Sequence, residues 1–180
     1  MAKYYTNLNK NPWKFLPKTF LIKNGLSDPT FLNFITETQN CTFSKSSADN
    51  IWIIKPGEHS NRGKGIRVWE TLDQIKHYIK YNPRKSYIIQ KYLSEPLLYN
   101  NRKFDIRCFG LFISINGIKK GYFYNGGYLR TSSEEFDLSD IHNRDIHLTN
   151  DAIQSNGENY GKYENWNKLS FSDFEKYLKK

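Results

Sequence analysis

Residues 51–66 read IWIIKPGEHSNRGKGI, and this stretch sets the interpretation of the whole chain. Its first four residues are apolar and mostly β-branched, which predicts a short buried strand that presents Lys55 at its end. The sequence becomes apolar again at residues 66–69, which predicts a second strand. The stretch therefore predicts a β-hairpin with a polar loop rich in glycine.

The hairpin loop combines three glycines, Gly57, Gly63 and Gly65, with the cations Arg62 and Lys64. Glycine allows positive φ, so successive N–H groups can turn toward an anion such as a phosphate. The alternative is a basic hairpin loop without a ligand. The loop at 57–65 is not a Walker loop. One residue too many separates Gly57 from Gly63, and Gly65 stands where the Walker pattern has Ser or Thr. It is not a dinucleotide fingerprint, because a strand rather than a helix follows.

Length and composition indicate a globular chain of one domain or two small lobes, with 180 residues of which 38% are hydrophobic. Lysine and arginine number 27 against 18 acidic residues, which gives a formal charge of +9. Such a charge favours polyanionic partners: nucleic acid, ATP or an acidic protein tail. No recognisable nucleic-acid motif is present, so a basic nucleic-acid-binding protein is the least supported of these interpretations.

The low cysteine count and the lack of recognisable targeting signals predict a cytosolic protein. Cys41 and Cys108 are too few for a disulfide framework or a cysteine zinc site, and the histidines lack metal-ligand spacing. No apolar run reaches the roughly 20 residues needed to span a bilayer, and the N-terminus lacks the apolar centre of a signal peptide. We therefore expect no membrane partner.

The first half of the chain is predicted to alternate strands and helices. Residues 1–25 predict an irregular arm and a strand over 18–23. Ser27-Asp28-Pro29 caps a helix that ends near Gln39, and residues 40–50 form a polar loop that is a candidate for disorder. Thr71 caps a second helix to about Lys80.

A strand over 86–91 follows and ends beside a Pro-marked turn at 92–96. Such a strand end can offer backbone groups to a flat base such as adenine, and the alternative is an ordinary strand terminus.

The second half opens with a hairpin of residues 104–124 that turns at Asn116-Gly117. Because side chains alternate along a strand, Lys103, Asp105 and Arg107 share one face. This face is either a cleft wall that meets a triphosphate or a solvated face with a surface ion pair.

Arg130 is predicted to leave a glycine-loosened strand at 126–133 in a hydroxyl-rich turn. Its planar fork suits a carboxylate or a phosphate, and the alternative is an ordinary surface arginine. Residues 134–145 are acidic and loop-like. A last helix is capped either at Ser170-x-x-Asp173 or at Ser172-x-x-Glu175.

Six motifs, in order, resemble the tubulin-tyrosine ligase and ligase-like family. They are Trp52-Ile-Ile-Lys-Pro-Gly57, Asn61-Arg-Gly-Lys-Gly-Ile66, Gln90-Lys-Tyr-Leu93 with Pro96-Leu-Leu98, Arg102-Lys-Phe-Asp-Ile-Arg107, Gly127-Tyr-Leu-Arg-Thr-Ser132 and His147-Leu-Thr-Asn150. The resemblance extends over residues 11–178. It implies an α+β, ATP-grasp-like fold, with antiparallel sheets, flanking helices and ATP held between two lobes.

The resemblance further implies three parts: residues 1–25 as arm and first strand, 26–93 as the central lobe with the phosphate loop, and 94–180 as a partial C-terminal lobe. It implies an ATP- and Mg²⁺-dependent ligase in the cytoplasm, associated with the cytoskeleton or cilia. Such an enzyme joins tyrosine, glycine or glutamate to the acidic C-terminal tail of tubulin through an acyl phosphate.

Site roles also follow from the resemblance. It implies that Lys55 and Arg107 are catalytic, gripping the phosphates and the transferred phosphate respectively, and that Arg130 binds the carboxylate of the incoming amino acid. The implied nucleotide-binding residues are Lys55, Arg62, Gly63, Gln90, Lys91, Tyr92, Leu93, Lys103, Asp105, Thr149 and Asn150.

Two departures from the family pattern define the alternatives. The acidic magnesium ligands of the family are expected beyond Lys180, so the runner-up interpretation is a non-catalytic module that binds nucleotide or microtubules. Residues 151–154 read DAIQ, and Ile153-Gln154 is more similar to the tyrosine- and glycine-adding branches than to the glutamate-adding one. This leaves the choice of amino acid open.

Overall fold

A computed structural model describes residues 1–42, 50–58, 60–83 and 85–180, so most of the predicted polar loop at 40–50 lies outside the described residues. The chain divides into two compact units. Unit 1 consists of Met1–Pro96 with Leu138–His142, and unit 2 of Leu97–Asp137 with Asn143–Lys180. Each unit contains an antiparallel sheet and helices, as expected for the α+β, ATP-grasp-like fold class.

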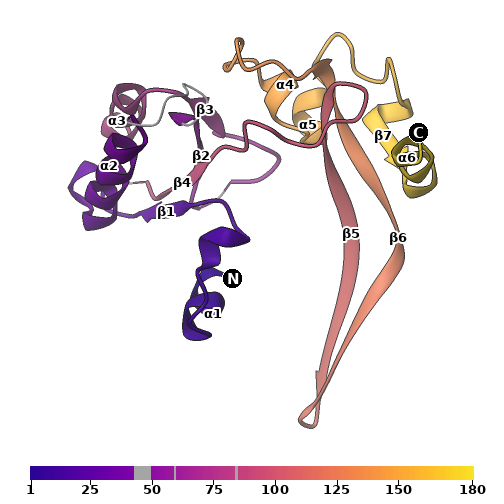
Figure 1. Ribbon diagram of the computed structural model, residues 1–180, viewed down its shortest axis with the longest axis horizontal. Coiled ribbons are helices and arrows are strands. Elements are labelled where there is room, and N and C mark those ends of the chain that lie inside the picture. Colours follow the sequence, from indigo (N-terminus) through magenta and orange to yellow (C-terminus); the bar gives the residue numbers. More distant parts are fainter. Residues whose placement is uncertain (43–49, 59, 84) are drawn as a thin grey trace. The chain divides into compact units, whose positions relative to one another are not determined.

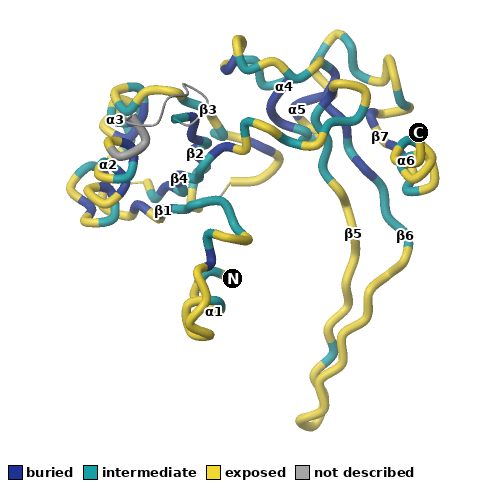
Figure 2. The backbone as a smooth tube through the Cα atoms, in the orientation of Figure 1, coloured by how far each residue is buried: buried dark blue, intermediate teal, exposed yellow. Residues whose placement is uncertain are grey.

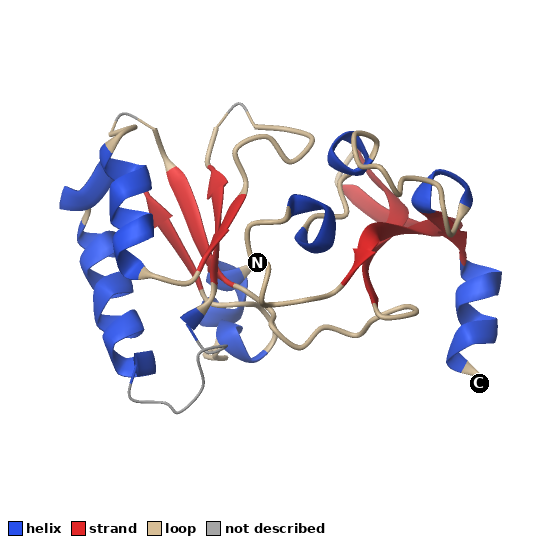
Figure 3. Cartoon of the chain, turned by 90° about the horizontal axis from the view of Figure 1, so that it is seen from above, coloured by secondary structure: helices blue, strands red, loops and turns tan. Residues whose placement is uncertain are grey.

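Unit 1 is a four-stranded antiparallel sheet in the order β1-β4-β2-β3. Its elements are α1 (Ala2–Asn7), β1 (Thr19–Ile22), α2 (Pro29–Thr42), β2 (Trp52–Pro56), β3 (Arg67–Trp69), α3 (Leu72–Lys80) and β4 (Tyr87–Lys91). The two long helices, α2 and α3, cover one face of the sheet (Figure 1, Figure 3). Fully buried Phe34, Trp52, Ile54, Ile75 and Ile89 form the core between them.

The predicted hairpin is confirmed: β2 pairs with β3, with Ile53 opposite Val68. Gly63 and Gly65 have φ of 76° and 73°. The expectation of positive φ at Gly57 is wrong, and close approach explains this glycine instead, because a Cβ there would lie 2.2 Å from Oγ of Ser86. Since that contact joins the end of β2 to the start of β4, Gly57 lets the two strand ends approach.

Helix caps in unit 1 follow the sequence closely. Thr71 Oγ1 accepts from the Gln74 N–H and the Gln74 side chain returns to the cap, a complete capping box. Asp28 Oδ1 accepts from the Thr30 N–H, 2.8 Å away, at the start of α2. Two expectations were wrong: α2 continues past Gln39 to Thr42, and α1 lies inside the arm predicted to be irregular.

Unit 2 is a three-stranded antiparallel sheet in the order β5-β6-β7. Its elements are β5 (Arg102–Ile115), β6 (Ile118–Glu135), α4 (Arg144–His147), α5 (Asp151–Gln154), β7 (Lys168–Ser170) and α6 (Phe171–Leu178). Positive φ at Asn116 and Gly117 confirms the predicted hairpin turn. Figure 2 shows the half of the hairpin nearest this turn as exposed, and Phe112 and Phe123 are 68% and 69% exposed.

The predicted turn after Arg130 is wrong, because β6 continues to Glu135. Thr131, Ser132 and Ser133 are buried strand residues, and their hydroxyls find partners inside the unit. Gly127 marks close packing rather than loosening, since a Cβ there would lie 2.6 Å from Cζ of Phe171 on α6.

The last helix begins after Ser170, whose Oγ accepts from the Asp173 N–H, so the first of the two predicted caps is confirmed. Strand β7, which immediately precedes it, was not predicted. None of the helices formed by the described residues combines the length and the apolar character that a membrane-spanning segment requires.

Candidate functional site

The sheet of unit 1 brings Lys55 and Gln90 together on the face opposite the helices. Lys55 lies on β2 and Gln90 on the neighbouring strand β4. Their strand neighbours Ile54 and Ile89 are fully buried in the core, so by alternation Lys55 and Gln90 point to the other face. Lys55 Nζ donates to Oε1 of Gln90 over 2.7 Å. The pair offers a partly buried cation beside an amide.

Burial lowers the pKa of the Lys55 amine below its ordinary value, because desolvation penalises the charged form. The folded chain therefore binds this proton more weakly than the unfolded chain. The resulting cost to stability is present below the folded-state pKa, and it fades as the pH rises from there toward the unfolded-state pKa.

We expect the dimethylated Lys55 amine, observed by ¹³C NMR, to titrate at lower pH in the folded protein than in urea. Lys55→Arg would assign the resonance. A folded-state value equal to or above the urea value would contradict the effect of burial.

The segment predicted to surround adenine continues from β4. The Lys91 and Tyr92 N–H groups donate to the carbonyls of Lys18 and Ile51, at 2.7 and 3.1 Å. The Tyr92 side chain is 3% exposed, and burial raises its pKa. Leu93, in contrast, is exposed. Any role of Tyr92 toward a ligand would therefore use its backbone rather than its ring.

The glycine loop places Arg62 in the left-handed region, with φ of 55°, on the surface beside buried Gly63. A cavity of about 410 Å³ adjoins the loop and is lined by Pro56, Tyr78 and Tyr87 among others. Because Pro56 and Tyr87 are paired across β2 and β4 and point to the helix side, this cavity does not lie on the face of Lys55.

In unit 2 the structure brings together Asp105, Arg130 and Thr149. Arg130 donates to both carboxylate oxygens of Asp105, from Nε at 2.9 Å and from an Nη at 2.6 Å. Thr149 Oγ1 donates to the same carboxylate over 2.6 Å. The hydrogen bond to Asp105 raises the pKa of the Arg130 guanidinium. Asp105 is thus paired with an arginine of the neighbouring strand β6, and the assigned ligand roles of these residues stay predictions.

The remaining residues predicted for unit 2 have contacts of their own. The Lys103 N–H donates to Oγ of Ser132 over 3.0 Å, and its ammonium lies 5.8 Å from the Phe136 ring. Arg107 is exposed, with Cζ 5.8 Å from the Phe109 ring. Asn150 is the N-cap of α5.

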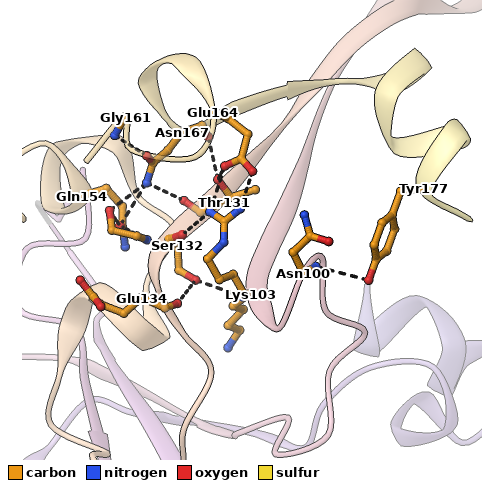
Figure 4. A network of polar contacts seen from close by, with 12 residues as sticks. Asn100, Lys103, Thr131, Ser132, Glu134, Gln154, Gly161, Glu164, Asn167 and Tyr177 are labelled. Atoms are coloured by element: carbon orange, nitrogen blue, oxygen red, sulfur yellow. Dashed lines mark hydrogen bonds and ion pairs between the residues drawn. The ribbon is translucent and has the colours of Figure 1, made fainter. Parts of the chain in front are cut away.

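The best-connected polar cluster of unit 2 was missed by the sequence interpretation (Figure 4). Arg102 is 2% exposed and forms a bidentate ion pair with Glu164, while Thr131 Oγ1 also donates to Glu164 over 2.7 Å. Nearby, Oε1 of Gln154 accepts from the N–H and the hydroxyl of Ser133. Arg102 and Glu164 are 62 residues apart, so no local pattern links them.

Within the described ranges, no three His, Cys, Asp or Glu side chains gather closely enough to hold a metal ion. The carboxylate of Asp105 is already engaged by an arginine and a hydroxyl. These side chains do not fit a complete Mg²⁺ site.

Comparisons with known proteins agree with the motifs. The model of the Tubulin-tyrosine ligase family matches residues 2–180. Tubulin glycylase 3B of Drosophila melanogaster is 37% identical over 134 residues, which cover 72% of this chain and 18% of that protein. Tubulin glycylase 3E of Tetrahymena thermophila is 40% identical, covering 76% of this chain and 10% of that protein. The human probable tubulin polyglutamylase TTLL2 is 34% identical, covering 83% of this chain and 23% of that protein. The chain thus spans less than a quarter of the length of each of these relatives.

Proposed function

The chain belongs to the tubulin-tyrosine ligase family, and from that premise we propose that it acts as an ATP-dependent ligase that joins an amino acid to tubulin. The observation that carries the nucleotide part is the Lys55–Gln90 pair, a half-buried cation and an amide on one open sheet face. A half-buried ammonium is costly unless it is paired, and a phosphate pairs it.

Within unit 1 we assign Lys55 to the α- and β-phosphates and Arg62-Gly63 to the loop that covers them. Gln90, Lys91, Tyr92 and Leu93 border adenine. Within unit 2 we assign Lys103, Asp105, Thr149 and Asn150 to the ribose and phosphates, Arg107 to the transferred phosphate, and Arg130 to the carboxylate of the amino acid. Mg²⁺ is the family's partner for the phosphates.

The proposed reaction has two steps and needs no covalent enzyme nucleophile. A carboxylate oxygen of tubulin bonds to the γ-phosphorus of ATP, the bond to the bridging oxygen breaks, and ADP leaves. The amine of the amino acid then attacks the acyl carbon of this acyl phosphate, the bond from that carbon to the phosphate oxygen breaks, inorganic phosphate leaves, and the amide nitrogen gives up a proton to the phosphate or to solvent. The charged residues of the chain act by positioning and by neutralising the charge that develops.

The formal charge of +9 supports tubulin as the protein partner, because basic surfaces speed the capture of acidic tails. The relatives named as glycylases make glycine the first amino acid to test. With tubulin as the substrate, association with the microtubule cytoskeleton or cilia follows.

We expect ATP-dependent incorporation of labelled glycine into tubulin, and none into tubulin that lacks its acidic C-terminal tails. Parallel reactions with tyrosine and glutamate identify the amino acid. ATP binding without incorporation of any of the three would favour the alternative, a non-catalytic module that binds nucleotide or microtubules.

A further inference from the structure

A chain of hydrogen bonds runs across the sheet of unit 1 to the proposed nucleotide face. Thr19 Oγ1 donates to the Pro17 carbonyl over 2.8 Å. Gln90 Nε2 donates to Thr19 Oγ1 over 2.9 Å, and Gln90 Oε1 accepts from Lys55 Nζ over 2.7 Å. Thr19 lies directly opposite Gln90 in the pairing of β1 with β4, so the contact is built into the register of the sheet.

The directions of these bonds fix the orientation of the Gln90 amide. A threonine hydroxyl has one proton, and Thr19 gives it to Pro17, so toward Gln90 it can only accept. Gln90 must therefore turn its NH₂ group to Thr19. At the other end Lys55 carries an ammonium, which can only donate, so it requires the amide oxygen. Both neighbours independently demand the same orientation, which removes the ambiguity that an isolated amide would have.

The consequence concerns what this position offers to a ligand. A carbonyl oxygen has two lone pairs, so Oε1 of Gln90 can accept a second hydrogen bond besides the one from Lys55. One N–H of the NH₂ group donates to Thr19, which keeps that group on the side of β1. On the side of Lys55, Gln90 thus presents an acceptor, and there it suits a ligand that brings a donor.

We propose that Thr19 is a specificity-determining positioning residue, which holds the Gln90 oxygen on the Lys55 side of the amide so that the site selects a purine with a 6-amino group over a 6-oxo purine. This inference rests on the proposed function, because it takes Gln90 to border the base. A 6-oxo group would place its oxygen against Oε1 of Gln90. Sites built around a hydrogen bond discriminate strongly against analogues that leave their polar groups unpaired.

The test compares ATP with inosine triphosphate, which carries a 6-oxo group in place of the 6-amino group. Dissociation constants are measured by calorimetry on the chain of residues 1–180. The wild type is expected to bind ATP more tightly by roughly tenfold or more. In Thr19→Val, which keeps the shape but removes the acceptor, the amide can rotate once Lys55 turns to the phosphates as proposed, and the preference is expected to fall to within about threefold of equality.

Two matched variants serve as controls. Thr19→Ser keeps the hydroxyl and is expected to keep the preference. Thr36→Val makes the same chemical change on the exposed surface of α2, where the hydroxyl donates to the Leu32 carbonyl, and it is also expected to keep the preference.

An unchanged preference in folded Thr19→Val would overturn the inference. If that variant does not fold, the wild type still tests the role of Thr19. Equal binding of ATP and inosine triphosphate by the wild type would overturn that role while leaving the proposed nucleotide site intact. Failure of the wild type to bind either nucleotide overturns the proposed function and this inference together.

Discussion

Lys55→Ala is expected to reduce ATP-dependent ligation by about 100-fold or more, the range seen when one preorganised group that stabilises transition-state charge is removed. The ammonium projects from a rigid strand and is held by Gln90, so little reorganisation is needed for it to meet a phosphate. ATP affinity should fall as well, by roughly 10- to 100-fold, because a hydrogen bond to a charged group is lost. Initial rates and calorimetric dissociation constants measure the two effects.

The matched control for this variant is Lys80→Ala, since Lys80 is an exposed lysine at the end of α3 in the same unit. It should leave both quantities unchanged. Arg107→Ala should lower turnover with less effect on ATP affinity, because its assigned role concerns the transferred phosphate. Full turnover in a folded Lys55→Ala protein would remove Lys55 from the proposed site.

Local signals explain why much of unit 1 could be predicted. The β-branched run at 51–54, the glycine loop and the apolar return define a hairpin within a few residues of one another, and Thr71 with Gln74 is a self-contained cap. Where a residue is required by a contact with a distant part of the chain, the prediction from sequence was wrong. Gly57 is needed because Ser86 approaches it from another strand, and no local pattern shows that contact.

The hydroxyl run at 131–133 illustrates the same limit in unit 2. Small polar residues after a glycine pair are typical of a turn. Here they continue a buried strand, because Gln154 and Glu164, distant in sequence, accept their hydrogen bonds. In the site, alternation along β5 predicts that Lys103, Asp105 and Arg107 share a face. The pairing of Asp105 with Arg130 rather than with a near neighbour depends on the hairpin register.

Glu164→Ala is expected to destabilise unit 2 by about 3–5 kcal/mol, because it leaves the Arg102 guanidinium as an uncompensated buried charge. The Arg102 side chain is 2% exposed and that of Glu164 is 9% exposed. Arg102 also donates to the Ser132 carbonyl over 3.0 Å and lies 4.3 Å from the Tyr163 ring, so it cannot leave without disrupting its surroundings. Native-state amide exchange of Thr131 and Ser133 measures the loss within unit 2 itself.

The surface pair Lys179–Glu175 provides the matched control, since both of its side chains are well exposed. Glu175→Ala removes the same carboxylate from an ion pair in the same unit, and the expected cost is at most about 0.5 kcal/mol. A loss for Glu164→Ala as small as that for Glu175→Ala would show that the Arg102 charge finds water or another partner.

Removing both members of the buried pair separates the value of the pair from the cost of an orphaned charge. In Arg102→Met with Glu164→Leu no buried charge remains, so the double variant should be more stable than Glu164→Ala alone by about 3 kcal/mol or more. Thr131 would still lose an acceptor, but its hydroxyl also lies 3.3 Å from the Asn167 carbonyl, which can take over. If amide exchange showed the double variant to be no more stable than the single one, the pair itself, rather than the avoidance of an unpaired charge, would hold β6 in place.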